Sequence, residues 1–158
     1  MLKKIAITLC LSTLLSSPLM ADVPPYYLSA SDRLVEKAHI ALQADELFEA
    51  LVTFEKAIVS NPKNIQAYHG LGQSHMALKN FDLALKYLDT GLLMEPSSLP
   101  LLKDRGLTLI ALQDESAAKE VLDKMRFICE DKPCGSGDEL EHALTIALQE
   151  KVAEINPE

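Results

Sequence analysis

Apolar residues recur at spacings of three and four along most of this chain, with polar residues between them. Between Tyr68 and Leu78 the recurrence follows one face of an α-helix. A second apolar stripe, around Leu88, begins soon after Asn80, a residue type that favours the position before the first turn of a helix. Pro96 ends this stripe, because proline cannot continue a helix. The stretch predicts two helices joined by a short turn.

The same pattern returns at a fixed period along the chain. Under one constant shift, small residues fall on small ones and large residues on large ones in three sets: Ala38, Gly72 and Gly106; Ala50, Ala84 and Ala118; Phe54, Leu88 and Leu122. Pro62 and Pro96 also superpose. Small side chains at fixed places let two helices cross closely, since a larger one would hold the backbones apart. The period predicts helix-turn-helix units at residues 31–64, 65–98 and 99–132.

These positions resemble the tetratricopeptide repeat, whose pattern combines an aromatic residue, a Leu-Gly pair, a later alanine, a large residue, a small residue and a proline. The second unit resembles it at Tyr68, Leu71, Gly72, Ala84, Leu88, Gly91 and Pro96. The first unit supplies Ala38, Ala50, Phe54, Ala57 and Pro62, and the third keeps Gly106, Ala118 and Leu122. The third unit departs from the pattern at Met125 and Glu130. The resemblance implies an all-α fold, a right-handed α-α superhelix of about three helix-turn-helix repeats.

The segment 133–158 predicts a disulfide-flanked loop followed by a closing helix. Ser136 and Glu139 have the spacing of a capping box, in which each side chain bonds a free backbone N–H of the first turn. Apolar residues then recur on one face at Leu140, Ala143, Leu144, Ala147 and Leu148. Such a helix covers the apolar face that a stack of repeats leaves at its end. The alternative is that it docks a partner.

Residues 1–21 have the layout of a secretory signal peptide. Lys3 and Lys4 precede a short apolar run, and Leu19 to Ala21 form a cleavage site of small and apolar residues. An uncleaved membrane anchor is the alternative, but the run is short for a membrane span. We therefore expect a periplasmic or secreted bacterial protein without stable membrane insertion. Residues 22–30 are expected to be a loose lead-in.

The charge of the chain argues against nucleic acid as a partner. The formal net charge is −8, and loss of the leader with its two lysines makes it more negative. Because no basic stripe offsets this charge, a polyanion would be repelled.

Only two cysteines, Cys129 and Cys134, remain once Cys10 leaves with the leader. In an oxidising compartment such a pair predicts a local disulfide. Free thiols and a redox-active pair are the alternatives, but the spacing is C-x4-C rather than C-x-x-C.

Residues that could carry chemistry are few. The four histidines, His39, His69, His75 and His142, lack the neighbouring Cys or carboxylate motif of a zinc site. His75 occupies a packing position and is expected to be a buried ring. The chain has no G-x-S-x-G elbow and no complete dinucleotide-binding loop. We expect neither an enzyme nor a bound metal or cofactor.

The resemblance implies a ligand groove lined by the first helix of each unit. The residues that would line it are Val35, His39, Gln66, His69, Gln73, Met76, Lys103 and Leu107, together with Asp32, Leu42 and Ile110. Their mixture of apolar, amide and imidazole groups suits an extended or helical peptide. One family subtype grips a C-terminal carboxylate with Lys, Asn, Asn, Lys and Arg. The matching positions are Val35, His39, Gly70, Pro100 and Asp104, and none carries the required residue.

The sequence therefore predicts a non-enzymatic adaptor of the bacterial cell envelope that binds a protein or peptide in its groove. The alternative is an accessory subunit or chaperone of an envelope, secretion or pilus-type assembly, acting through its convex face or its last helix.

Overall fold

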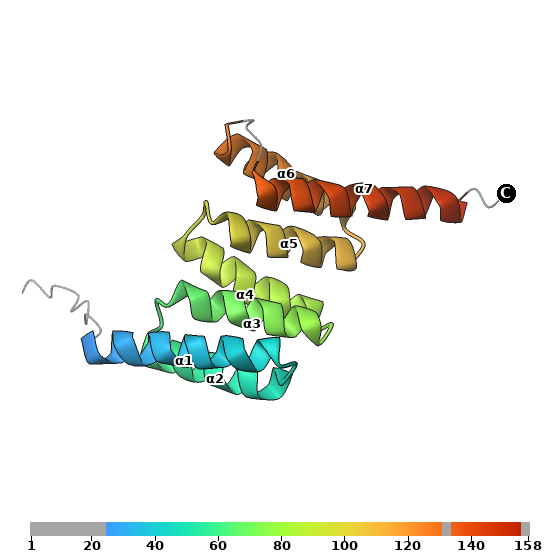
Figure 1. Ribbon diagram of the computed structural model, residues 1–158. Helices are drawn as coiled ribbons and strands as arrows, with labels where there is room; N and C mark the ends of the chain where they lie inside the picture. The colour runs from blue at the N-terminus through green and yellow to red at the C-terminus, as the bar shows by residue number, and fades with distance from the viewer. Residues whose placement is uncertain (1–24, 131–133, 156–158) are drawn as a thin grey trace, which may run out of the picture.

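The computed structural model describes residues 25–130 and 134–155, which form seven helices and no strand. The helices are α1 (Pro25–Gln43), α2 (Leu47–Ser60), α3 (Ile65–Ala77), α4 (Phe81–Met94), α5 (Leu99–Ala111), α6 (Glu115–Ile128) and α7 (Gly135–Ile155). They follow one another as a stack, with α1 and α2 at one end and α6 and α7 at the other (Figure 1). The predicted all-α solenoid of helix-turn-helix repeats is confirmed.

The helix boundaries repeat with the sequence period. The helices α2, α4 and α6 begin and end at equivalent positions of successive units, and so do α3 and α5. The turn inside each pair has one residue in the left-handed conformation, with φ of 60° at Asp45, 58° at Lys79 and 61° at Gln113. This conformation stops the first helix and redirects the chain into the second. None of the three positions holds a glycine, the residue type that would have predicted the left-handed conformation from the sequence.

Two rows of helices run along the stack. Each helix contacts the next one in the chain, and α1 contacts α3 while α3 contacts α5. The helices α2, α4 and α6 make no such contacts with one another. The first helices are thus closer together than the second ones. We call α1, α3 and α5 the inner row and α2, α4 and α6 the outer row.

Small residues lie where helices cross within the repeats and between them. A β-carbon on Gly72 would lie 2.6 Å from Cδ2 of Leu88, and one on Gly91 would lie 3.0 Å from Cδ1 of Leu101. The alanines at these crossings are fully buried: Ala38, Ala50, Ala57, Ala67, Ala84 and Ala118. Large side chains such as Phe54, also fully buried, fill the remaining volume.

The closing helix α7 packs against both α5 and α6. Its Leu140 lies over Gly106 of α5, where a β-carbon would come within 2.5 Å of Cδ2 of the leucine. Leu144 is also buried, whereas Leu148 is 46% exposed. The C-terminal half of α7 projects beyond its neighbours in the stack (Figure 1).

The predicted capping box at the start of α7 is wrong. The helix begins at Gly135, so Ser136 lies inside the first turn rather than before it. Glu139 instead accepts a hydrogen bond of 2.8 Å from Nζ of Lys103 in α5. The Glu139 carboxylate, which the local spacing predicted to cap the helix, is therefore part of an ion pair between two helices.

The expected loose lead-in is also wrong where the structure describes it. Helix α1 begins at Pro25, so residues 25–30 are helical. Proline suits the first helical position, because its fixed φ fits the helix and its missing N–H would have no partner there. The expected signal peptide, residues 1–21, lies outside the described residues.

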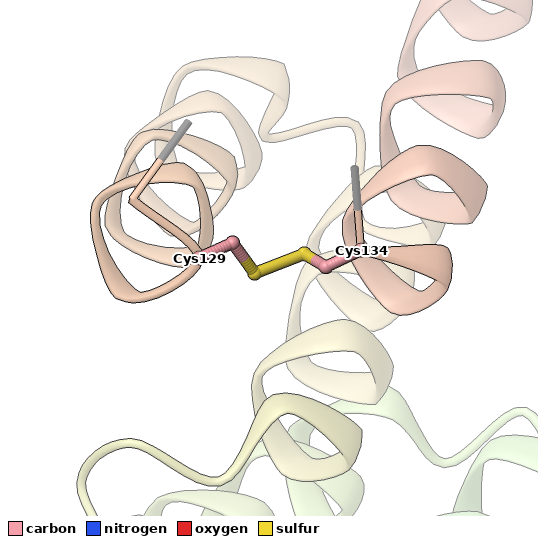
Figure 2. The surroundings of a disulfide bond; sticks show 2 residues. All are labelled: Cys129 and Cys134. Atoms are coloured by element: carbon pink, nitrogen blue, oxygen red, sulfur yellow. A yellow bond between two sulfur atoms is a disulfide. The ribbon is translucent and has the colours of Figure 1, made fainter. Parts of the chain in front are cut away.

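The structure joins Cys129 and Cys134 in a disulfide, with their Cα atoms 6.3 Å apart. Figure 2 shows this bridge between the end of α6 and the beginning of α7. Two ion pairs add to it: Arg126 with Glu141 at 2.6 Å and Lys151 with Glu115 at 2.8 Å.

Candidate functional site

A buried carboxylate links two helices of the inner row. Asp104 of α5 accepts hydrogen bonds at Oδ2 from Nε2 of His69, at 2.7 Å, and from Nε2 of Gln73, at 2.9 Å. The exposed fractions of the Asp104 and His69 side chains are 8% and 13%. His69 and Gln73 lie one turn apart on α3, so both reach the same oxygen.

A third inner helix adds a histidine beside this cluster. The ring of His39, on α1, lies edge-on to Phe54 with 5.1 Å between the centroids. Burial lowers the pKa of His39, and the nearby His69 lowers it further. Both causes favour the neutral form of the ring, in which one nitrogen donates a hydrogen bond and the other accepts one.

Each end of the inner row has its own polar contacts. At the α1 end, Nδ2 of Asn64 donates to Oγ of Ser31 at 2.8 Å and to Oδ1 of Asp32 at 3.1 Å. At the α7 end, Lys103 pairs with Glu139, and this hydrogen bond raises the pKa of Lys103. The row therefore has polar side chains fixed by hydrogen bonds from α1 to α7.

The predicted groove residues do not all reach the surface of this row. Val35 is 8% exposed and belongs to the hydrophobic core around Ala38 and Phe54, so its assignment to the groove is wrong. Leu107 is half-buried and packs against the second core cluster. The other six have exposed or half-buried side chains: His39, Gln66, His69, Gln73, Met76 and Lys103.

Asp104 lies in the inner row, but the sequence pattern does not predict it as a groove residue. By family position it falls only among the residues of the carboxylate clamp, where it has the wrong charge. A usable signal is present, because Asp104 has the three-and-four spacing to Leu101 and Thr108, both of which are buried. A charged residue in a buried register indicates a bonded carboxylate.

His69 and Asp104 form the pair of this site with the most reactive side chains. His69 and Asp104 have the geometry of a base and its orienting carboxylate, but no described hydroxyl or thiol donates a hydrogen bond to the ring. Within residues 25–130 and 134–155, no group of three or more His, Cys, Asp and Glu could hold a metal ion.

His75 lies away from the cluster and contributes to packing. It is 8% exposed and stacks parallel to Tyr87 with 5.3 Å between the ring centroids. Burial lowers its pKa, and its Nδ1 has no hydrogen-bond partner.

The outer row exposes large apolar side chains. Phe48, Val59, Leu93 and Phe127 are each between 78% and 84% exposed. Near Leu93, a depression of about 530 Å³ lies between α4, α5 and α6. No helix in the described ranges is both long and apolar enough to cross a membrane.

Comparison with known proteins finds a family whose pattern matches part of the stack. A model of the tetratricopeptide repeat family matches residues 41–104, from the end of α1 into α5. No curated protein sequence matches the chain.

Several solved structures have the same fold. The Sgt2 domain of Aspergillus fumigatus has a TM-score of 0.71 at 16% identity, covering 82% of this chain and 85% of that one. The first tetratricopeptide repeat domain of Spaghetti (RPAP3), bound to the HSP90 peptide SRMEEVD, has a TM-score of 0.67 at 21% identity. The match covers 77% of this chain and 97% of that one. The Yersinia enterocolitica type III secretion chaperone SycD, in complex with a peptide of the translocator YopD, has a TM-score of 0.66 at 18% identity. The match covers 81% of this chain and 96% of that one. At these identities the likeness concerns the fold alone.

Proposed function

We propose that this chain, part of which matches the tetratricopeptide repeat, is a non-enzymatic adaptor which binds a peptide or protein segment along its inner row. The observation that carries this proposal is the cluster of His69, Gln73 and Asp104, which fixes polar groups across two successive repeats. Fixed donors and acceptors beside half-buried apolar residues such as Met76 suit the backbone of an extended segment.

The comparisons with solved structures also support a peptide-binding role. Two similar structures hold a peptide: the HSP90 peptide in Spaghetti and the YopD peptide in SycD. We extend peptide binding from those proteins to this chain as part of the proposal. An acidic C-terminal tail is a poor candidate ligand, because Asp104 would place a carboxylate near it.

We further propose that the adaptor works outside the cytoplasm of a bacterium. The layout of residues 1–21 supports export, and a disulfide between Cys129 and Cys134 is compatible with an oxidising compartment. Mass spectrometry of the exported protein is expected to find a mature chain that begins at Asp22. Retention of the full-length chain in the cell would contradict export.

The binding surface is tested by capture of partners from a periplasmic extract. The double variant His69→Ala and Gln73→Ala is compared with the wild type after circular dichroism has established that both are folded. We expect the double variant to lose most of the captured protein. Unchanged capture would argue against binding along the inner row.

A second surface is favoured by the apolar side chains of the outer row. An accessory subunit or chaperone acting through this convex face would use Leu93 and Phe127, which are both 84% exposed. The double variant Leu93→Ala and Phe127→Ala therefore serves as the matched comparison. Loss of capture by this variant alone would favour the outer row over the inner row.

A further inference from the structure

Asp104 has one oxygen with hydrogen-bond partners and one without. Both bonds, from His69 and Gln73, end on Oδ2. No described residue donates to Oδ1, although only 8% of the side chain is exposed. Unlike the unpaired Nδ1 of His75, Oδ1 keeps some contact with solvent. A carboxylate largely removed from water in this way needs donors at both oxygens or a positive charge beside it.

The Asp104 charge attracts Lys103 and helps to raise the pKa of its ammonium, but no basic group of the described residues donates a hydrogen bond to Oδ1. Lys103 is adjacent in sequence, but its ammonium is held by Glu139 of α7 at 2.8 Å. His39 lies near His69, and burial lowers the pKa of its ring, which favours the uncharged form. The whole chain is acidic, with a net charge of −8, so its field adds to the attraction of a cation.

We propose that Oδ1 of Asp104 anchors a cationic group of the bound peptide, either a lysine or arginine side chain or an N-terminal ammonium. The two donors on Oδ2 hold the carboxylate in place, and the incoming N–H groups complete its hydrogen bonds. The proposal rests on peptide binding along the inner row and names the class of residue that this row selects.

The experiment is selection of a random heptapeptide phage library on the immobilised full chain, on Asp104→Asn and on Asp123→Asn. Asparagine keeps the size of Asp104 and an acceptor for His69. Asp123 lies on α6 with 58% of its side chain exposed, so its substitution removes the same charge from the outer row. Circular dichroism melts establish that all three proteins are folded.

Peptides enriched on the wild type and on Asp123→Asn are expected to share a lysine or arginine, or to require a free N-terminus. One enriched peptide is then synthesised with norleucine in place of its basic residue, and separately with an acetylated N-terminus. Fluorescence anisotropy is expected to show affinity about tenfold weaker for whichever change removes the cation. The same change should have little effect on binding to Asp104→Asn.

The outcomes distinguish the two proposals. Affinity for the wild type that survives both the norleucine and the acetylation change, or a cation preference that survives in Asp104→Asn, overturns the role of Asp104 and leaves peptide binding standing. No enrichment on the wild type overturns both.

Discussion

The backbone of Gly70 in α3 lies against the ring of Phe54 in α2, so closely that a β-carbon on the glycine would overlap the ring. Phe54 is fully buried in the core of the first repeat. The close approach fixes how the second repeat is seated on the first. Gly70 is not among the small positions of the repeat pattern, although it falls at one of the positions of the carboxylate clamp.

Substitution of Gly70 by alanine is expected to lower the free energy of unfolding by about 2 kcal/mol. Overpacking of a core costs about 1–3 kcal/mol, and alanine returns up to about 1 kcal/mol in helix propensity. Overlap with a fully buried ring places the cost at the upper end of that range. Urea denaturation followed by circular dichroism measures the change.

The matched control for this substitution is Gly135→Ala. No other heavy atom lies within 4 Å of a β-carbon at Gly135, so this variant should be neutral or slightly stabilised. Equal losses in the two variants would show that contact with Phe54 is not the cause.

Helix caps at equivalent places in two repeats should differ in their contribution. Asp114 accepts a hydrogen bond of 3.0 Å from the backbone N–H of Ala117, whereas Asn80, at the same place one repeat earlier, makes no side-chain cap bond. We expect Asp114→Ala to lower the free energy of unfolding by about 1 kcal/mol and Asn80→Ala to lower it by less. Thermal melts of the two variants check this, and the reverse order would contradict it.

Stability is expected to fall as the solution becomes mildly acidic. Burial lowers the pKa of His39 and of His75 below the ordinary value of 6.5, so the unfolded chain takes up protons more readily than the folded one. The stabilisation is fully present above the ordinary value and is lost as the pH falls through the folded-state values. The urea midpoint should therefore be lower at about pH 5.5 than at about pH 7.5.

A substitution can assign part of this pH dependence. His75→Phe keeps the stacking on Tyr87 and removes the titrating group, so the midpoint should vary less with pH than in the wild type. His142 is exposed, and His142→Gln should leave the dependence unchanged. An undiminished dependence in His75→Phe would exclude this ring as a source.

Reduction of the disulfide is expected to destabilise the C-terminal end of the stack. The bridge between Cys129 and Cys134 closes a short loop, so its loss should cost about 2 kcal/mol. Hydrogen exchange should increase first in α7, whose described part is anchored in the hydrophobic core by Leu140 and Leu144. Urea denaturation with and without reductant measures the cost, and titration of two free thiols before reduction would contradict the bridge.

Much of the fold was predictable because its signals are local and repeated. The periodic recurrence of small residues such as Gly72 and Ala84 indicates the helix pairs, and Pro62 and Pro96 mark where units end. The candidate site was only partly predictable. His69 and Gln73 could be assigned to the inner row by position, but their shared partner, Asp104, lies on another helix.

The helical repeats and their period follow from the amino-acid sequence without further information, since turn residues and helix faces depend on neighbours within a few positions. Which side chain meets which across helices depends on the tertiary structure. Packing made Glu139 the partner of Lys103 rather than a cap, placed Val35 in the core, and set Gly70 against Phe54. These contacts join residues that are distant along the chain, and the register between packed helices selects them rather than any local pattern.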